Sequence, residues 1–542
     1  MRLIERVVPW LVAIVVGLPV LIGRYPPMID LPCHEEIVAA MRHFGDDVRY
    51  PRGLLTWNLG HPNQLFYLLA YALAFVLPVS AACKVVVAAS VAAVPLAAGR
   101  LADHLGASRW VAVLVAPLAL GFFFYFGFVG NLLSLGLLIA SMPVLDRFAS
   151  HPTARGAAIG TLTLLLLYEA HDSAVAIGGV AIVVLSLGYP VLRMATAWRA
   201  TPLVIAGGVA VVEQAYAMRH LGSNLRALPQ VIDLATWQKI DQLPEALLGI
   251  HGSTTTLPAF FVVAAVVAML AVQRAMQHRT ALPLSTGVRQ WVHAYRFEAL
   301  GLLLIGLYFE VPFGFAGAMW LHARFLTPGV AVLAIALAPR RPLLMPVAAR
   351  GGSALAVVAV LALVKPEMTA TGAVYSDLDG ILQRIAPGSA IAPLDVSGGP
   401  RRWLVFTVAG AAARASAERG GRMAASFTEA SPIPPVVIAP RHRWEDSLAR
   451  MAVDSSSLEP AFDLRRFRYV ISWAVPGQEK DITLALLPEA RLIARSGGWL
   501  LFESTHAVES VLSSEPASSG EESVRGRLEA LAQTRGASFG KP

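Results

Sequence analysis

A group of ionisable side chains follows the first apolar segment, in the sequence Pro26-Pro-Met-Ile-Asp30-Leu-Pro-Cys-His34-Glu35-Glu36. If a helix begins at Leu31, Asp30 is its N-cap, and His34 lies one turn later on the same side. Partial removal from water at a membrane edge raises the pKa of a carboxyl group toward neutral pH, which suits it to general-base catalysis. The sequence therefore offers Asp30, His34 and Glu35 as catalytic candidates. The other reading is a solvated loop in which Asp30 only caps the helix.

A second polar group, Tyr168-Glu169-Ala-His171-Asp172, lies between two apolar runs. Ionisable groups within a membrane segment cost several kcal/mol unless they are paired or hydrated. Tyr168, His171 and Asp172 are therefore candidates for a substrate-binding cavity. The alternative is a structural Tyr–His–Asp hydrogen-bond network between helices.

A cationic candidate occurs in Trp320-Leu-His-Ala-Arg324-Phe325, where an apolar run begins again. A guanidinium at this depth can grip phosphate oxygens in a bidentate fork, as a lipid-linked phosphate would require. It can equally serve as a snorkelling anchor. Glu310 ends the preceding apolar run and is the expected partner of Arg324, so both belong to the predicted substrate-binding set.

Metal and redox chemistry have weaker support in the sequence. Asp30, His34, His171 and Asp172 together could offer a site for a divalent cation, although the predicted chemistry requires no metal. The two cysteines, Cys33 and Cys83, exclude a disulfide framework and zinc-type spacing. There is no phosphate-binding loop typical of ATPases, which disfavours ATP-driven transport.

Membrane helices must position these residues. The chain has 542 residues, of which 56% are hydrophobic and 15% charged, whereas soluble domains carry about 25% charged residues. Its net charge of +8 comes from arginines in short loops between apolar segments, which indicates membrane topology rather than nucleic-acid binding. Apolar runs long enough to form membrane helices are Val7–Gly23, Gln64–Val79, Cys83–Gly99, Trp110–Phe126, Asn131–Leu145, Gly156–Ala170, Ala174–Leu192, Pro202–Ala217, Pro258–Val272, Phe297–Phe313, Phe325–Ala338 and Leu343–Val364.

Basic residues in short loops favour the cytoplasm, and that rule fails repeatedly if every run crosses the bilayer. The conflict disappears if Gln64–Val79, which follows a polar stretch, is a juxtamembrane or half-inserted helix. About eleven crossings then remain in a multi-pass inner membrane protein with a cytoplasmic N-terminus. The candidate residues all fall on the outer face.

The composition changes after Val364. We predict a transmembrane domain over 1–364, with a first outer loop at 24–63 and the juxtamembrane helix at 64–79. A small extracytoplasmic α/β or α+β domain follows over 365–506, with a helix at Asp377–Ile385 and strands at Trp403–Val408, Pro435–Ile438, Tyr469–Trp473 and Trp499–Glu503. The polar stretch 507–542 reads as a disordered tail.

Several short motifs together resemble a family, the bacterial GT-C fold membrane glycosyltransferases. These depend on polyprenyl-phosphate sugars and include relatives of protein mannosyltransferases and aminoarabinose transferases. The motifs are Asp30-Leu-Pro-Cys-His34, the aromatic hairpin Phe126-Gly-Phe128 with Asn131, Tyr168 with His171, Ala323-Arg-Phe325, and Gly497-Gly-Trp-Leu near the end. The hairpin taken alone reads as an interfacial anchor, with sugar stacking as the alternative. The chain departs from better-known branches in having Asp-Leu where an Asp-Glu pair is expected, with Glu35 and Glu36 nearby.

The resemblance implies a glycosyltransferase in which Asp30 is the base and Arg324 contacts the donor phosphate. Its expected partners are a polyprenyl-phosphate-linked sugar, the bilayer, and a glycan, lipid or protein acceptor on the outer face. The implied C-terminal domain would help to bind the acceptor. Two other functions stay open, a transporter or flippase for a lipid-linked glycan and a catalytically inactive envelope-assembly protein.

Overall fold

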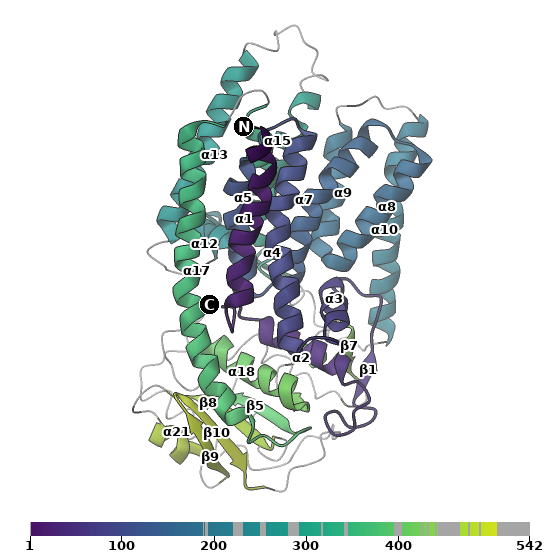
Figure 1. Cartoon of the computed structure of the whole chain (residues 1–542). Coiled ribbons are helices and arrows are strands. Elements are labelled where there is room, and N and C mark those ends of the chain that lie inside the picture. The colour runs from purple at the N-terminus through teal and green to yellow at the C-terminus, as the bar shows by residue number, and fades with distance from the viewer. Residues whose placement is uncertain are drawn as a thin grey trace. The chain divides into compact units, whose positions relative to one another are not determined.

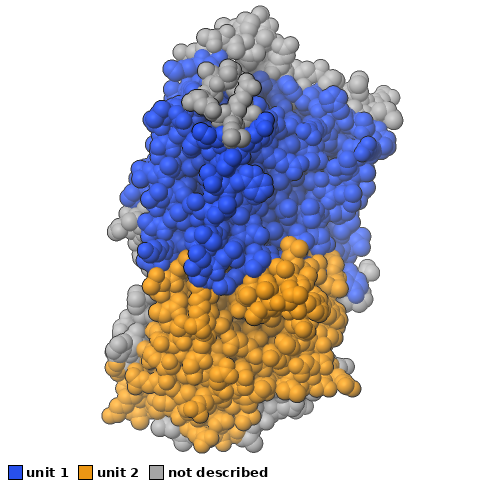
Figure 2. Space-filling model, in the orientation of Figure 1, with its two compact units in different colours: residues 1–23, 62–66, 84–367 blue, residues 24–61, 67–83, 368–542 orange. Residues whose placement is uncertain are grey.

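The computed structural model divides the chain into two units built from interleaved segments. Unit 1 contains Met1–Gly23, Pro62–Phe66 and Lys84–Glu367, and unit 2 contains Arg24–His61, Tyr67–Cys83 and Met368–Pro542 (Figure 2). The structure describes residues 2–187, 189, 193–220, 231–249, 256–279, 292–315, 318–340, 345–394, 404–423, 426–430, 433–439, 442, 467–474, 477, 479–486 and 489–506. The domain boundary after Val364 stays a prediction. The expected disordered tail, 507–542, lies outside the described residues.

Unit 1 is a bundle of apolar helices, several of which run side by side in Figure 1. Its helices are α1 (Arg2–Ile22), most of α4 (Val79–His104), α5 (Val111–Ala119), α6 (Phe122–Phe126), α7 (Val129–Ser150), α8 (Ala154–Ala170), α9 (Asp172–Ser186), α10 (Arg193–His220), α11 (Thr236–Asp241), α12 (Leu243–Leu248), α13 (Thr256–Arg279), α15 (Arg296–Glu310), α16 (Ala323–Leu337) and the first part of α17 (Val347–Leu382). Three short strands, β2 (Val231–Ile232), β3 (Gly314–Phe315) and β4 (Ala318–Met319), form a small antiparallel sheet.

Helices occupy the apolar runs that the sequence indicated, so the helical class of this part is confirmed. In the described part of the chain, five helices are long and apolar enough to cross a bilayer: α1, α4, α7, α13 and α17. The apolar segments Val111–Phe126, Asp172–Ser186 and Ala323–Leu337 are shorter. The chain is thus an integral membrane protein, while the number of crossings and their orientation stay predictions.

The run at Gln64–Val79 contains α3 (Leu65–Leu73), a helix of nine residues. At 1.5 Å per residue it is about 14 Å long, roughly half the thickness of the hydrocarbon core. A helix of this length cannot cross a bilayer alone. The structure is therefore compatible with the juxtamembrane position that the distribution of arginines required.

Unit 2 contains a five-stranded mixed sheet with strand order β6-β5-β8-β10-β9. Strand β5 (Ala390–Leu394) lies parallel to β6 (Arg422–Met423) and β8 (Tyr469–Trp473), and β10 (Trp499–Ser504) pairs antiparallel with β8 and β9 (Ala490–Ser496). The end of α17 and α18 (Leu404–Arg419) share a buried core with this sheet. The remaining elements of the unit are α2 (Leu31–Arg42), β1 (Leu55–Trp57), most of α3, α19 (Phe427–Ala430), β7 (Val436–Ile438) and α21 (Glu479–Leu486).

Three of the strands predicted for this region, at Pro435–Ile438, Tyr469–Trp473 and Trp499–Glu503, are confirmed by β7, β8 and β10. The predicted helix at Asp377–Ile385 is confirmed as far as Leu382, where α17 ends. The predicted strand at Trp403–Val408 is wrong, because α18 begins at Leu404. Its buried residues, Val408, Ala411, Ala412 and Ala415, recur at helical spacing and pack into the core.

Most of the segment between α1 and α3, Arg24–His61, is an integral part of unit 2. Strand β1 pairs antiparallel with β7, so that Leu55 lies opposite Ile438 and Trp57 opposite Val436. The backbone carbonyl of Arg49 accepts a hydrogen bond of 2.8 Å from the amide of Gly421. Gly421 has φ of +92°, and a Cβ there would collide with Ser389, so the close approach requires glycine. The loop and the C-terminal sheet thus fold as one body.

Candidate functional site

Asp30 occupies the N-cap position of α2 but does not cap the helix. Its φ and ψ of −90° and −6° are helical, and its side chain makes no capping hydrogen bond. The side chain is half-buried, and this loss of hydration raises the pKa of its carboxyl group from 3.8 to about 7, with no compensating charge or hydrogen bond from the residues that the structure describes. An unsatisfied carboxylate that is half-ionised near neutral pH can accept a proton. These are the properties of a general base.

His34 lies one helical turn after Asp30, as the spacing predicted, and its amide donates to the Asp30 carbonyl at 3.1 Å. Its Nδ1 lies 2.7 Å from the hydroxyl of Tyr67, a buried residue of α3, and the edge of Phe427 packs against the imidazole. Burial, followed by the charge of Asp30, raises the pKa of the Tyr67 phenol. Tyr67 therefore stays protonated and can fix the orientation of His34. The sequence reasoning missed Tyr67, because nothing local links α3 to α2.

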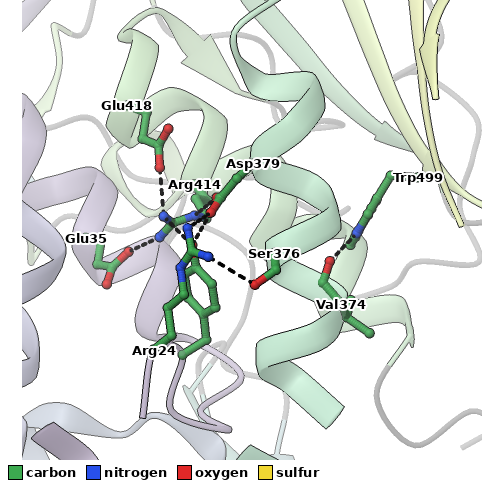
Figure 3. A network of polar contacts seen from close by, with 9 residues as sticks. Arg24, Glu35, Val374, Ser376, Asp379, Arg414, Glu418 and Trp499 are labelled. Carbon is green, nitrogen blue, oxygen red and sulfur yellow. Dashed lines mark hydrogen bonds and ion pairs between the residues drawn. The ribbon is translucent and has the colours of Figure 1, made fainter. Parts of the chain in front are cut away.

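Glu35 lies on a different side of α2, within a cluster of charged groups. It is buried, and its Oε2 lies 3.4 Å from Nη1 of Arg414 in α18 (Figure 3). Nη2 of Arg414 lies 2.7 Å from Oε1 of Glu418, and Nε lies 3.3 Å from Oδ1 of Asp379 in α17. One buried guanidinium thus connects three carboxylates from three helices. Glu35 is engaged in holding α2 against the C-terminal segment.

Two residues from the start of the loop complete this cluster. The hydroxyl of Tyr25 donates to Oδ2 of Asp379 at 2.6 Å and accepts from Nη2 of Arg414 at 2.9 Å. Arg24 forms an ion pair of 2.6 Å with the same Oδ2 and donates to Ser376 at 3.2 Å (Figure 3). Ion pairs and hydrogen bonds therefore hold the segment just before Asp30 in place. The sequence did not single out Arg414, because two of its partners, Glu35 and Asp379, lie far from it along the chain.

Next to Glu35 on α2, Glu36 is buried and bonded to serines of the C-terminal segment. Its Oε1 accepts hydrogen bonds from Ser426 at 2.8 Å and from Ser416 at 3.4 Å. Consecutive glutamates on α2 are thus both bound by residues more than 370 positions away. This leaves Asp30 and His34 as the members of the first acidic group with capacity for chemistry.

A separate polar group in unit 1 surrounds the start of α16. Nη1 of Arg324 lies 3.5 Å from Oδ1 of Asp172, the first residue of α9, and Nη2 donates to the carbonyl of Met319 at 3.4 Å. Its Nε has no hydrogen-bond partner within the described ranges. The guanidinium also lies over the ring of Phe128, 5.7 Å from the centroid. Arg324 therefore retains unused donor capacity in a largely buried position.

Asp172 and His171 form a compact turn between α8 and α9. Nδ1 of His171 lies 2.6 Å from Oδ1 of Asp172 and 2.9 Å from Oγ of Ser173, and Asn131 approaches at 3.4 Å. The side-chain carbonyl of Asn63 accepts a hydrogen bond of 2.9 Å from the amide of Asp172. His171 is buried, while the side chain of Asp172 is 50% exposed. The carboxylate is thus fixed in place and still open to a ligand.

Two members of the predicted substrate-binding set lie outside this contact group. Tyr168 is buried and contributes its backbone carbonyl, which accepts from the amide of Asn63 at 3.3 Å. Glu310 is exposed at the end of α15. Arg324 pairs with Asp172 rather than with Glu310, the partner expected from the sequence.

The aromatic hairpin lies beside Arg324 and packs within the protein. Phe122 is buried, whereas Phe126 and Phe128 are partly exposed. Trp320 packs on Phe122 and Phe126 with centroid distances of 5.3 and 5.2 Å, and on Phe313 at 4.7 Å. Trp320 has φ of +59°, a strained value for a bulky side chain. These contacts join the hairpin and Trp320 in one aromatic cluster, and its role as an interfacial anchor stays a prediction.

His322 is a further buried group that the sequence reasoning gave no role. It is fully buried between the rings of Tyr308 and Trp320, and neither ring nitrogen has a hydrogen-bond partner among residues that the structure describes. Burial, and secondarily the nearby Lys239, lower the pKa of the imidazole to about 4. His322 is therefore neutral at physiological pH.

The four side chains suggested as a cation site fall in different units, with Asp30 and His34 in unit 2 and His171 and Asp172 in unit 1. Over the described ranges, no group of three or more His, Cys, Asp or Glu side chains is arranged to hold a metal ion.

No protein-family model and no curated protein matches the chain. Two solved structures that match are those of ArnT from Cupriavidus metallidurans, one bound to undecaprenyl phosphate and one in the apo state. Both are 14% identical to this chain. The match covers 93% of this chain and 98% of the bound structure with a TM-score of 0.38, and 92% and 97% for the apo structure with a TM-score of 0.40. A likeness of this degree assigns no role to any residue, so the roles of the residues rest on their own geometry.

Proposed function

We propose that this protein is an integral membrane glycosyltransferase, which moves a sugar from a polyprenyl-phosphate donor to a glycan, lipid or protein acceptor on the outer face of the membrane. The observation that carries the proposal is Asp30. Its carboxyl group is half-buried, has a pKa of about 7 and is not used to cap α2. A carboxylate kept in this state is costly for the fold and useful for catalysis.

In the proposed reaction, the Asp30 carboxylate removes the proton from an acceptor hydroxyl. The acceptor oxygen forms a bond to the anomeric carbon of the sugar while the bond from that carbon to the phosphate oxygen breaks. The electron pair stays on the polyprenyl phosphate that leaves, and the proton stays on Asp30. His34, held by Tyr67, is placed one turn away to orient the acceptor.

Arg324 is the proposed ligand of the donor phosphate. Its distance of 3.5 Å to Asp172 is long for a charge-assisted hydrogen bond, and its Nε is free of partners in the part of the chain that the structure describes. A phosphate can therefore bind this guanidinium without breaking a tight pair. His171 and Asp172 would orient Arg324, and Tyr168 would support their turn. Glu35 is assigned to holding α2 through Arg414 rather than to proton transfer.

The test is a transfer assay with purified protein and radiolabelled polyprenyl-phosphate sugars. Asp30→Asn should lower kcat by about 10²- to 10⁴-fold, the usual contribution of a general base. Asp47→Asn is the matched control, because Asp47 is an exposed aspartate of the same loop whose partner is the exposed Arg52. Its activity should equal that of the wild type.

Arg324→Ala should lower kcat/KM by about 10²-fold or more, as expected for a donor to a developing phosphate charge. Arg155→Ala, at an exposed position near the start of α8, is the control. Transfer that is unaffected by Asp30→Asn would remove Asp30 as the base. Donor binding without turnover by wild-type protein, over a broad panel of sugars and acceptors, would overturn the enzymatic proposal in favour of transport.

A further inference from the structure

The backbone at Trp320 adopts a conformation that a bulky side chain disfavours. Its φ of +59° lies in the left-handed region, where the Cβ of an ordinary residue approaches the following carbonyl oxygen. Among the residues that the structure describes, Asn63 is the other non-glycine residue at positive φ, and asparagine tolerates this region. A bulky residue held there destabilises the fold, and such strain is concentrated at functional sites.

The turn that contains Trp320 explains the φ angle but not the tryptophan. The turn joins β4 to α16, and the amide of Leu321 donates to the carbonyl of Phe313 at 3.0 Å. On the other side of Trp320 in the sequence, the carbonyl of Met319 accepts from Nη2 of Arg324 at 3.4 Å. Glycine would adopt the same backbone without strain. The reason for a tryptophan at this position therefore lies in its ring.

The indole ring is held by other rings, and Trp320 keeps part of its surface open. Phe313 meets the indole edge-on with a centroid distance of 4.7 Å, and Phe126 packs at an angle with a centroid distance of 5.2 Å. The buried ring of His322 lies nearly parallel to the indole, 6.0 Å away between centroids. Trp320, Phe126 and Phe313 are each partly exposed. Together these three residues form an aromatic surface that a ligand can reach.

Polar groups lie beside this aromatic surface. Phe126 packs on Phe128 with a centroid distance of 5.5 Å, and the guanidinium of Arg324 lies 5.7 Å from the centroid of Phe128. The carboxylate of Asp172, whose side chain is 50% exposed, lies 3.5 Å from that guanidinium. An isoprenoid chain has no use for an exposed carboxylate. A sugar uses both features, because its hydroxyl groups donate to a carboxylate and its C–H groups lie on the negative face of an aromatic ring.

We propose that the indole ring of Trp320 stacks against the sugar of the donor while Arg324 holds the donor phosphate. This inference rests on the proposed function, which assigns the phosphate to Arg324. The strained turn fixes the ring four residues before Arg324, next to the phosphate that carries the sugar. Trp320 thereby distinguishes a donor that carries a sugar from a lipid phosphate that carries none.

The experiment compares the binding of two lipids of equal charge to purified full-length protein in detergent, without acceptor. One lipid is a polyprenyl-phosphate sugar from a panel of glucose, mannose and arabinose, and the other is polyprenyl methyl phosphate, a diester without a sugar. Calorimetry gives the two dissociation constants, and their ratio is the selectivity for the sugar. Wild-type protein should bind at least one sugar-linked lipid more tightly than the methyl diester. Trp320→Leu should lower this selectivity about fivefold, as loss of an aromatic stacking contact would, and leave the affinity for the methyl diester unchanged.

Two further variants serve as controls for the ring. Trp320→Phe keeps an aromatic face and should retain most of the selectivity, and Trp10→Leu, at a 63% exposed tryptophan of α1, should retain all of it. Equal losses of affinity for both lipids in Trp320→Leu would overturn the proposal, since the ring would then serve the lipid chain or the fold. Wild-type protein without selectivity for any sugar of the panel would overturn it as well.

Arg324→Ala separates this inference from the proposed function. It should weaken the binding of both lipids alike, because both carry the phosphate. If it does so while Trp320→Leu leaves the selectivity unchanged, the assignment of the phosphate to Arg324 stands and the stacking of Trp320 is refuted. Binding of both lipids that does not depend on Arg324 would refute both assignments.

The strain at Trp320 is tested by thermal unfolding. Trp320→Gly should unfold at a higher temperature than Trp320→Ala, because glycine adopts the left-handed conformation freely. The opposite order would overturn the proposal, because position 320 would then carry no strain.

Discussion

Replacement of Asp30 by asparagine should stabilise the protein at alkaline pH. The folded protein holds the carboxyl proton more tightly than the unfolded chain, because burial raises the Asp30 pKa from 3.8 to about 7. The stability that this group contributes is therefore fully present below pH 3.8 and is lost as the pH rises through about 7. Above pH 7 the folded state must carry a half-buried charge. Asparagine has a similar shape and carries none.

The size of the effect follows from the two pKa values. Their difference corresponds to about 4 kcal/mol at roughly 1.36 kcal/mol per pH unit, which is an upper bound. Asp30 keeps part of its surface in contact with solvent, and this contact lowers the cost of ionisation. We expect Asp30→Asn to raise the free energy of unfolding at pH 8 by about 1 to 3 kcal/mol, and to change it little at pH 4.

The assay is thermal or denaturant unfolding of purified protein in a mild detergent between pH 4 and 8. Asp47→Asn, in the exposed part of the same loop, serves as the control and should follow the wild type throughout. The variant and the wild type should coincide near pH 4, and the difference in stability between them should grow up to about pH 7 and stay constant above it. If the wild type loses no stability relative to Asp30→Asn between pH 4 and 8, the pKa of Asp30 is not raised and the reasoning is refuted. A catalytic defect combined with a gain in stability is the expected signature of a functional residue.

Three further outcomes are expected. Arg414→Ala should destabilise the protein by about 3 kcal/mol or more, because it removes the guanidinium that Glu35, Asp379 and Glu418 share, and limited proteolysis should show earlier cleavage of the first loop; Arg414→Lys should recover part of the loss. Gly421→Ala should cost about 2 kcal/mol or more in denaturant unfolding, whereas Gly45→Ala, also at positive φ but with open space around it, should cost only about 1 kcal/mol. Tyr67→Phe should lower kcat about fivefold with little change in donor KM, since it removes the hydroxyl that bonds to His34, and equal losses in both would contradict that role.

The sequence predicted the helices well because long apolar runs leave few alternatives to a helix in a bilayer. Strands at Tyr469–Trp473 and Trp499–Glu503 were also predictable, as short β-rich segments between turns. The strand predicted at Trp403–Val408 was wrong because this apolar segment is the start of a longer helical pattern. Val408, Ala411, Ala412 and Ala415 recur at helical spacing and continue that pattern beyond Val408.

The sequence indicated which residues belong to the candidate site, but it did not indicate which of them pair with one another. The position of His34 one turn from Asp30 followed from helix geometry, and both residues lie as expected. Glu35 has the same chemistry as Asp30, yet its partner Arg414 lies 379 positions away and converts it into a structural anchor. Likewise, the choice of Asp172 over Glu310 as the partner of Arg324 depends on how α9 and α16 pack, which no local pattern encodes.

The pairing of β1 with β7 has a consequence for how the protein is made. Leu55 and Ile438 are about 380 residues apart, so at about 5 to 20 residues per second the ribosome needs roughly 20 to 80 s to deliver the second strand after the first. During that interval the loop has no partner for its exposed strand edge, and for most of it Glu35 and Glu36 lack Arg414, Ser416 and Ser426, which bind them. Chains interrupted before α18 would lack all of these partners permanently. The first loop is therefore the segment by which a quality-control protease could recognise an incomplete chain.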